Sequence, residues 1–490
     1  ESCLCTQMWC CAGVMDFYEY EHIPGIDWLG RYIGTELEPK QIGSVAEQLG
    51  KKHVLTETFA CCGWDVTPQE LKRIAEWQYV NGVNLMCQHL SAYSIRGQRK
   101  RDYPNTYSEH MAWFDKFKEF NDYFASLGYM LSESKNRVNV LVLHPIKSAY
   151  LTYDRDVDYL SIKDVEDSFT RTVEKFGSEN IPHHYGDENI IKRHGKVENG
   201  KFIVGDYAYD YVYIPEMKSM DKSTLDLLTR FTAQGGKLAV ENGLPQYLEG
   251  EKYAFDELKP NCGFADIEKS VEYKIDTNGG NIRSAYRDGE FGRFLYVVNI
   301  GEKDAEIEVK LNSKYPYGYD LEKLEKYPLV LKNGKVCLKL EEGGSAIIFE
   351  SDEPYAPVKF YDGKYIDMSG EWKIAETPLN SLTIDKAQLS FDGVNYGKKA
   401  YIPAIFNDLI SKKYVGKIYL KYVFEVKEKT DKMFLECERM DIKECLVNGN
   451  AIKLEKKGLL DRSFLTGDIA NKVVVGENVV IFTIDFYESE

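Results

Sequence analysis

The segment from residue 53 to residue 89 constrains the fold of this chain more than any other. It opens with a short run of apolar and β-branched residues that stops on Glu57, HVLTE, and a glycine-containing loop separates this run from a helix. Thr67 and Glu70 fit a capping box, Pro68 takes the first helical position, and the apolar residues that follow recur at helical spacing. A second apolar run, VNLMCQH, comes after Asn81-Gly82. Strand, helix and strand at this spacing predict a βαβ unit with parallel strands.

Two polar side chains stand where these predicted strands end. Glu57 closes the first run and His89 closes the second. Because the carboxyl ends of parallel strands meet at one edge of a sheet, as at the active face of a (β/α)8 barrel, we expect both side chains at that edge. The pattern predicts a catalytic carboxylate at Glu57, with a structural carboxylate that caps the next helix as the alternative. For His89 the two interpretations are a ligand for substrate hydroxyls and a hydrogen-bonded core imidazole.

At 490 residues the chain is too long for one core, so we expect three or four domains. Residues 1–135 read as two or three strand–helix units and end in a helix over Met111–Leu131. A closed barrel needs eight strands, so we expect an open, partial (β/α)8 barrel whose first strand has an unpaired edge. The start, ESCLCTQMWCC, has no initiator Met and no signal pattern, which predicts a piece of a longer protein that lacks its N-terminus.

Three further domains follow. Residues 136–271 alternate strands and helices, which predicts a doubly wound parallel sheet, flavodoxin-like in size, without a GxGxxG or Walker motif. Ser161 and Asp221 are predicted to cap two of its helices. Residues 272–352 should form a small β-sandwich, with hairpin turns at Asp288-Gly289 and Asn333-Gly334. Residues 360–490 should form a second β-rich domain. The fold class is therefore multidomain α/β plus all-β.

The composition excludes several classes of partner. There are 62 basic and 78 acidic residues, a net charge of −16, and no basic stripe, so we expect neither nucleic acid nor an anionic membrane as partner. No apolar run is long enough to span a bilayer. The 11 cysteines match no zinc pattern, and free thiols indicate a reducing compartment, which favours a cytoplasmic location. The spacing of Glu21, His22 and Asp27 matches no metal-ligand pattern, so we expect no metal and no cofactor.

Stretches from both halves of the chain share a resemblance. The first half carries EHIPGIDWLGR, KQIGSVAEQLGKKHVLTETFACCGWD, GVNLMCQH and YSIRGQRKRDYP. The second half carries SGEWKI, YVGKIYLKYVFEV, CLVNGNAI and FLTGDIANKVVVGENVVIFTI. The first set resembles bacterial glycoside hydrolases that join a (β/α)8 barrel to a family-two sugar-binding-type domain. The second resembles that jelly-roll, galactose-binding-like domain with its buried Trp. The middle domain resembles the trimerisation domain of family forty-two β-galactosidases, and the small sandwich resembles the domain that follows it there.

The resemblance implies a carbohydrate substrate and hydrolysis of an O-glycosidic bond by two carboxyl groups. Glu57 matches the nucleophile or base after the seventh barrel strand, and the general acid is expected upstream of this chain. No second catalytic carboxylate is then expected opposite Glu57 within roughly 10 Å. The resemblance does not choose between α-L-rhamnosidase-like and β-galactosidase-like relatives, and the trimerisation-type domain implies self-association.

The resemblance also implies substrate contacts in the loops around Glu57. The predicted substrate-binding residues are Glu21, His22, Asp27, Trp28, Trp64, Asp65, His89 and Arg96. For the loop residues the alternative is a solvated side chain or, at Trp64-Asp65, a plain loop anchor. Arg96 begins a basic cluster that includes Arg99, Lys100 and Arg101, and such clusters also occur as solvated faces. For the whole chain, the rival to a glycosidase is a non-catalytic carbohydrate-binding or assembly module.

Overall fold

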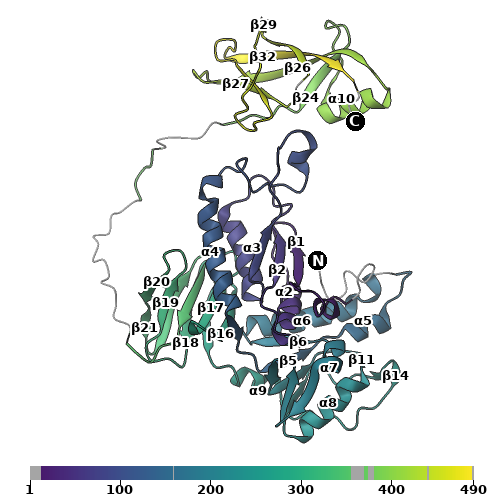
Figure 1. Cartoon of the computed structure of the whole chain (residues 1–490), viewed down its shortest axis with the longest axis vertical. Coiled ribbons are helices and arrows are strands. Elements are labelled where there is room, and N and C mark those ends of the chain that lie inside the picture. The colour runs from purple at the N-terminus through teal and green to yellow at the C-terminus, as the bar shows by residue number, and fades with distance from the viewer. Residues whose placement is uncertain (1–12, 158, 355–368, 374–379, 439–440, 488–490) are drawn as a thin grey trace. The chain divides into compact units, whose positions relative to one another are not determined.

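The computed structural model describes residues 13–157, 159–354, 369–373, 380–438 and 441–487. Figure 1 shows the course of the chain, which forms two compact units. The first unit contains residues 1–91 and 103–361, and the second contains residues 92–102 and 362–490. The chain therefore passes between the units three times, twice at the ends of residues 92–102 and once near residue 361.

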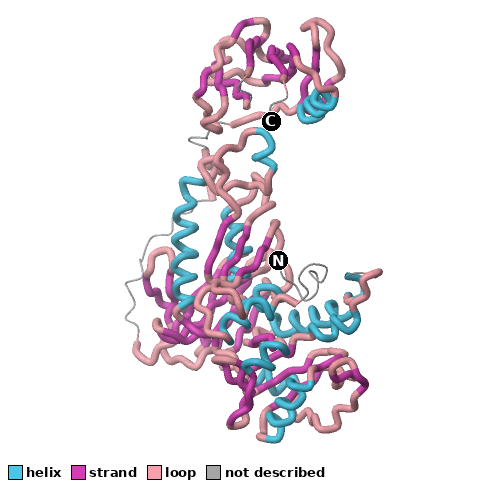
Figure 2. Tube along the Cα trace, turned by 45° about the vertical axis from the view of Figure 1, so that its right-hand side comes forward, coloured by secondary structure: helices cyan, strands magenta, loops and turns pink. Residues whose placement is uncertain are grey.

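The N-terminal part of the first unit is built from three parallel strands and the helices that follow them. Its elements are α1 (Met15–Tyr18), β1 (Gly25–Trp28), α2 (Leu37–Gln48), β2 (Leu55–Thr58), α3 (Pro68–Val80), β3 (Leu85–Gln88) and α4 (Phe114–Ser132). The strands lie in the order β1-β2-β3, and all pairs are parallel. Figure 2 shows α4 running alongside them. The predicted βαβ unit and the open partial sheet are confirmed, since β1 pairs only with β2 among the described strands.

The start of α3 follows the predicted chemistry. The Thr67 hydroxyl accepts a hydrogen bond from the backbone N–H of Glu70 (3.2 Å), and the Glu70 carboxylate accepts one from the backbone N–H of Thr67 (2.9 Å). This capping box satisfies two of the backbone donors that a helix N-terminus leaves free. Glu57 makes no part of this cap, so the alternative of a helix-capping carboxylate at Glu57 is excluded.

The central part of the first unit contains a parallel sheet. Its elements are β5 (Val140–Leu143), α5 (Ile146–Thr152), the 3-10 helix Tyr159–Ser161, α6 (Lys163–Ser178), β6 (His183–Gly186), α7 (Glu188–His194), β7 (Gly195–Glu198), β8 (Lys201–Val204), β9 (Tyr207–Tyr209), β10 (Tyr211–Ile214), β11 (Ser219–Met220), α8 (Lys222–Ala233), β12 (Lys237–Val240), β13 (Tyr247–Leu248), β14 (Glu251–Lys252) and α9 (Phe264–Lys269). The parallel strands lie in the order β12-β10-β5-β6, which in chain order is 4-3-1-2. A doubly wound sheet of the flavodoxin type begins with the same order.

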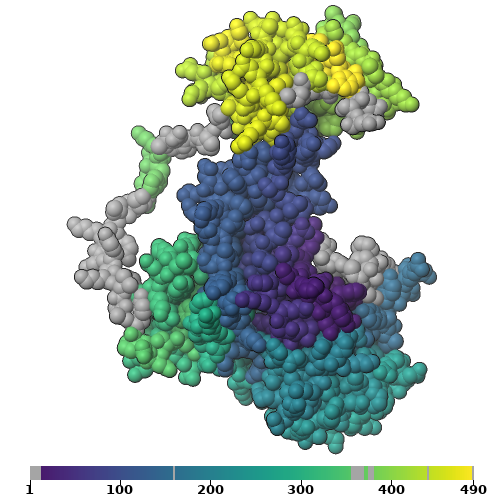
Figure 3. Space-filling model, viewed as in Figure 1, coloured from purple at the N-terminus to yellow at the C-terminus, as the bar shows by residue number. Residues whose placement is uncertain are grey.

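Helix α2 links these two sheets, because it follows β1 but packs on β6, the edge strand of the second sheet. The Ser44 hydroxyl accepts a hydrogen bond from the backbone N–H of Tyr185 (2.9 Å), and the Gln48 amide donates one to the Tyr185 carbonyl (3.0 Å). Side chains of α2 thus replace the neighbouring strand that β6 lacks. One apolar core runs through both sheets and contains Ile42 and Val142. In Figure 3 these parts, purple to teal, form one continuous body.

The C-terminal part of the first unit is a sandwich of two antiparallel sheets, of orders β20-β19-β23-β17-β16-β4 and β15-β18-β22-β21. Its strands are β4 (Ser134–Asn136), β15 (Lys274–Asn278), β16 (Ile282–Gly289), β17 (Gly292–Asn299), β18 (Ala305–Lys310), β19 (Tyr317–Asp320), β20 (Glu325–Pro328), β21 (Val330–Lys332), β22 (Lys335–Leu340) and β23 (Ser345–Phe349). The Asn333-Gly334 turn is confirmed, since both residues have positive φ, as a two-residue hairpin turn requires. In the other hairpin the turn lies at Glu290-Phe291, two residues after the predicted Asp288-Gly289. Asp288 and Gly289 are still part of the strand, because both pair with β17.

The second unit is β-rich. Its elements are the 3-10 helix η1 (Gly97–Arg101), β24 (Lys386–Ser390), β25 (Lys399–Tyr401), α10 (Ile402–Ser411), β26 (Gly416–Val426), β27 (Phe434–Cys437), β28 (Ile442–Val447), β29 (Asn450–Ala451), β30 (Glu455–Lys456), β31 (Leu465–Asp468) and β32 (Gly476–Phe486). β26 and β32 pair along their full length at the centre of a six-stranded sheet. The β-rich character predicted for this half is present in its described residues.

Three smaller predictions are not confirmed. Ser161 does not cap α6, because its hydroxyl accepts a hydrogen bond from the backbone N–H of Asp154 (2.9 Å). Asp221 stands at the N-cap of α8 but makes no side-chain cap bond. Trp372, which the resemblance to family-two domains predicts to be buried, is exposed. No helix in the described ranges is long and apolar enough to cross a membrane.

Candidate functional site

One face of the β1-β2-β3 sheet brings three reactive side chains into a row. Asp27 on β1 pairs in register with Glu57 on β2, and Glu57 pairs in register with Cys87 on β3. Because side chains alternate along a strand, residues in register on parallel strands point to the same face. All three side chains are half-buried. The row therefore lies on the more open face of this sheet, near the carboxyl ends of the strands.

The opposite face of the same strands is closed by α3. The Thr56 hydroxyl donates to the Gln78 amide oxygen (2.5 Å), and the Gln78 amide nitrogen donates to the Thr58 hydroxyl (3.1 Å). All three side chains are fully buried. These bonds hold β2 on α3 from both sides of Glu57, and so they fix the direction in which the Glu57 carboxylate points.

The Glu57 carboxylate makes no hydrogen bond or ion pair with any residue that the structure describes. A half-buried carboxylate normally acquires a donor, because burial without one costs free energy. An acceptor left open on a fixed strand is suited to contact a ligand or to take a proton from one.

His89 follows β3 directly and lies at the same carboxyl edge of the sheet. Its backbone N–H donates to the Thr58 carbonyl (2.9 Å), and its ring lies against Tyr103, with 5.4 Å between ring centroids. Its Nδ1 is buried and has no hydrogen-bond partner among the described residues. The structure thus places His89 at the edge predicted for it, beside the strand that carries Glu57.

The loops after β1 and β2 are joined to each other and to the segment after Tyr103. Gly30 donates its backbone N–H to the Ala60 carbonyl (2.7 Å), and Gly63 donates to the Pro104 carbonyl (2.9 Å). The Tyr107 hydroxyl donates to the Phe59 carbonyl (3.0 Å). These bonds between successive loops make the carboxyl edge of the sheet a fixed frame around the row of Asp27, Glu57 and Cys87.

Trp64 and Asp65 lie in the loop between β2 and α3 and differ in their surroundings. Trp64 is 42% exposed, so an aromatic surface stands on the loop that follows Glu57. Asp65 forms an ion pair with Arg31 (2.9 Å), which also binds Glu70. The hydrogen bond from Arg31 lowers the pKa of the Asp65 carboxyl. Asp65 therefore acts as a loop anchor here, and the prediction of a substrate contact is not supported.

Trp28 does not line the open face. It follows Asp27 on β1, so its side chain points to the opposite face, where it is buried. Its ring packs against Trp77 of α3 at a centroid distance of 4.6 Å, and its indole N–H donates to the Tyr32 carbonyl (3.0 Å). The prediction that Trp28 contacts substrate is wrong, because strand alternation puts it in the core.

Glu21 and His22 precede β1 and therefore lie at the amino-terminal edge of the parallel strands, away from Glu57. Both are exposed, and the Glu21 carbonyl accepts a hydrogen bond from Lys51 just before β2. Arg96 belongs to the second unit. Within the first unit, the structure does not bring Glu21 and His22 together with Glu57.

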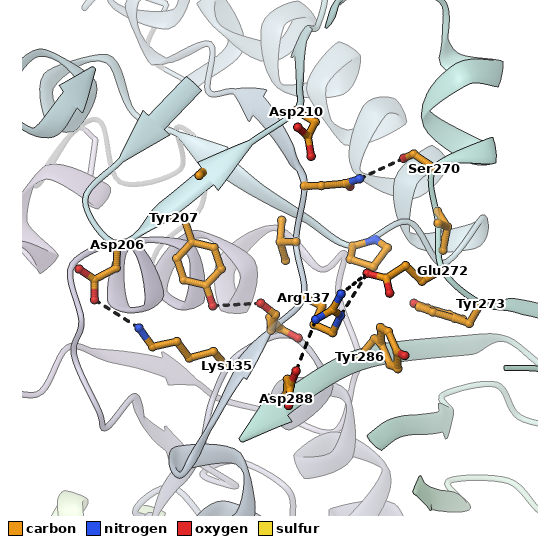
Figure 4. Close-up of a pocket in the computed structure, with 16 residues that line it drawn as sticks. Lys135, Arg137, Asp206, Tyr207, Asp210, Ser270, Glu272, Tyr273, Tyr286 and Asp288 are labelled. Atoms are coloured by element: carbon orange, nitrogen blue, oxygen red, sulfur yellow. Dashed lines mark hydrogen bonds and ion pairs between the residues drawn. The ribbon is translucent and has the colours of Figure 1, made fainter. Parts of the chain in front are cut away.

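A cavity of about 510 Å³ lies elsewhere in the first unit, between the parallel sheet and the sandwich (Figure 4). Its charged side chains are paired with one another: Arg137 binds Glu272 (2.6 Å) and Asp288 (3.4 Å), and Lys135 binds Asp206 (3.4 Å). None of the predicted site residues lines it. Because its polar groups satisfy each other, this cavity is a weaker candidate than the row at Glu57. No group of three or more His, Cys, Asp or Glu suited to a metal ion occurs in the described part of the chain.

Comparison with known proteins finds similarity to glycoside hydrolases. Residues 29–258, which include Glu57, match the model of glycoside hydrolase family 106, described as alpha-L-rhamnosidase. A putative beta-glucuronidase of Formosa agariphila is 24% identical over 367 residues, which make up 66% of this chain and 28% of that protein. The rhamnosidase of Novosphingobium sp. PP1Y shares the fold, with a TM-score of 0.52 and 16% identity over 96% of this chain and 48% of that chain.

The glycoside-hydrolase resemblance predicted from the sequence is confirmed at the level of the class. The chain spans less than half the length of both relatives. Sequence reasoning missed two residues of the site, Cys87 and Tyr103. Cys87 could have been found from strand alternation alone, because it holds the same position in its strand as Asp27 and Glu57. Tyr103 carries no such signal, since only the fold brings it to His89.

Proposed function

We propose that this chain is part of a glycoside hydrolase in which Glu57 acts as the nucleophile or general base. The observation that carries the proposal is the open Glu57 carboxylate, in register with Asp27 on the same face. It lies inside the segment that matches a glycoside hydrolase family. Hydrolysis of a glycosidic bond needs an ionised carboxylate to attack the sugar or to activate water. A carboxylate with no donor among the described residues, on a strand whose other face is hydrogen-bonded to α3, meets that need.

Asp27 gives the site a second carboxylate on the same side of the substrate. Neighbouring strands lie about 4.8 Å apart, so Asp27 and Glu57 approach a bound sugar from one direction. Asp27 is therefore suited to hold a sugar hydroxyl or the attacking water for Glu57. The general acid must protonate the leaving oxygen from another direction, and we expect it on a segment other than β1, β2 and β3.

The family match favours an α-L-rhamnoside as the first substrate to test, ahead of a β-galactoside or a β-glucuronide. Trp64 offers an exposed ring for a sugar face, and His89 lies at the same edge of the sheet. The rival function is a carbohydrate-binding or assembly module without chemistry. It is favoured by a three-stranded sheet where a complete barrel has eight strands.

The test compares the full-length protein with its Glu57→Gln variant on 4-nitrophenyl glycosides of rhamnose, galactose and glucuronic acid. We expect turnover of the rhamnoside and a loss of roughly three orders of magnitude in kcat for the variant, because general acid–base catalysis contributes on that scale. The melting temperature should stay unchanged. Glu306→Gln, which alters an exposed glutamate on β18, is the matched control and should behave as wild type.

Two outcomes contradict the proposal. Near-wild-type turnover by Glu57→Gln removes Glu57 from the mechanism. Binding of a sugar by the wild type without any hydrolysis, unchanged in the variant, favours the non-catalytic module.

A further inference from the structure

Residues 92–102 leave the first unit three residues after His89 and fold as part of the second unit. The segment returns to the first unit at Tyr103, whose ring lies against His89. Both ends of this loop thus stand at the edge that carries the candidate site. Its middle is held by residues more than 300 positions later in the chain.

Asp461 holds the first part of the loop. One of its carboxylate oxygens accepts a hydrogen bond from the backbone N–H of Ile95 (2.7 Å), and the other accepts bonds from the backbone N–H (2.7 Å) and hydroxyl (2.6 Å) of Ser463. The Ser463 and Ser94 hydroxyls also share a hydrogen bond (3.0 Å). Asp461 is only 4% exposed. Burial raises its pKa, but the hydrogen bonds outweigh this effect and hold the pKa well below its usual range. Asp461 is therefore a buried, ionised acceptor for the loop backbone.

Glu438 holds the second part, next to the end of β27. One carboxylate oxygen accepts a hydrogen bond from the backbone N–H of Gly97 (2.6 Å), and the other pairs with Lys100 (2.6 Å). Lys100 donates in turn to the Gly97 carbonyl (2.9 Å). A backbone N–H bound by a carboxylate makes a charge-assisted hydrogen bond, which is stronger than a bond to a neutral acceptor. Two such bonds, at Ile95 and Gly97, fix the path of the loop.

We infer that Asp461 and Glu438 are positioning residues for the candidate site: they hold the 92–102 loop and thereby restrict His89 and Tyr103 at its two ends. This inference rests on the proposed function, because it gives the second unit a role in placing a substrate contact. Lys100 then binds the loop to Glu438. The basic cluster to which it belongs, with Arg96, Arg99 and Arg101, is therefore not only a solvated face.

The test uses Asp461→Asn and Glu438→Gln in the full-length protein. Amide hydrogen exchange at Ile95 and Gly97 reports the two bonds directly, and trypsin cleavage after the four basic residues reports opening of the loop. We expect each variant to speed exchange at its own amide and cleavage of the loop by about tenfold, as loss of a charge-assisted hydrogen bond implies. Glu436→Gln is the matched control: this β27 glutamate accepts bonds from Leu459, Leu460 (3.1 Å) and Thr466 (2.7 Å) and makes no hydrogen bond or ion pair with the described loop residues 92–102.

Enzyme kinetics of the same variants distinguish a positioning role of the loop from a role in stabilising the fold. If the loop places His89 for the substrate, KM should rise severalfold in both loop variants while the melting temperature and the Glu436→Gln kinetics stay unchanged. Unchanged exchange and cleavage, or equal loosening in Glu436→Gln, overturns the inference, and so does loosening without a change in KM. If the wild type hydrolyses no glycoside, the proposed function fails together with the positioning role, whereas the exchange data still show whether the two carboxylates hold the loop.

Discussion

The two parallel sheets of the first unit are built from the same strand–helix pattern but differ in what covers them. All four residues of β5 and of β6 are buried. β1 and β2 alternate between half-buried and buried residues, and β3 is half-buried throughout. Parallel sheets are normally closed on both faces, so the second sheet is the ordinary case and the first is the exception. The half-open face holds Asp27, Glu57 and Cys87.

The comparison shows that polar side chains in the two sheets do different things. At the closed sheet, Glu47 of α2 accepts hydrogen bonds from His184 (2.9 Å) and Tyr207 (3.0 Å) and pairs with Arg287 (3.1 Å). Its carboxylate is fully partnered. At the open sheet, the Glu57 carboxylate has no partner among the residues described. A partnered carboxylate stabilises the fold, whereas an unpartnered one on a fixed strand is available for chemistry.

The largest effect expected from this contrast is on stability. Glu47→Gln should lower the free energy of unfolding by about 3–5 kcal/mol, because it leaves the buried Arg287 without its counter-charge. Glu57→Gln should leave unfolding unchanged. Urea denaturation of the two variants side by side measures the difference. Equal destabilisation by both would remove the distinction between the two sheets.

A smaller effect is expected at Asp27. Asp27→Asn should reduce kcat/KM by roughly 10- to 100-fold, or about 1.4–2.8 kcal/mol of transition-state stabilisation, if this carboxylate orients water or a sugar hydroxyl for Glu57. The unfolding midpoint should not move. Steady-state kinetics with the preferred 4-nitrophenyl glycoside provide the measurement. If Asp27→Asn shows wild-type kinetics, Asp27 has no role in catalysis and Glu57 is the carboxylate of this face that acts.

A third effect, of similar size to that at Asp27, is expected in the pH dependence of stability near the closed sheet. Burial raises the pKa of Glu188, the first residue of α7, from 4.5 to about 8. Between pH 4.5 and 8 the folded state therefore holds a proton that the unfolded chain has lost, so this contribution to stability is complete below pH 4.5 and declines as pH rises to 8. Glu188→Gln should make the fall in unfolding free energy over this range shallower by about 1–3 kcal/mol. Denaturation at pH 5 and pH 8 gives the slope, and an unchanged slope would contradict an ionisation of Glu188 in this range.

Local chemistry predicted many elements because the signals and their effects lie close together in the chain. Thr67, Pro68 and Glu70 determine the start of α3 through contacts within one turn. The Asn333-Gly334 turn is determined by the two residues that adopt positive φ. Where a partner is distant, local patterns gave no prediction: the polar residues Ser44 and Gln48 of α2 are buried against a strand about 140 positions away.

The sequence alone determined that Glu57 lies near the carboxyl end of a strand in a βαβ unit, because hydrophobic runs, a capping box and loop residues act over short distances. Tertiary structure decided which neighbours share its face. Strand register put Asp27 beside Glu57 and turned Trp28 into the core, and the fold carried residues 92–102 into the second unit, where Asp461 and Glu438 bind them. Register and docking depend on contacts between residues far apart in the chain, and local patterns carry no information about those contacts.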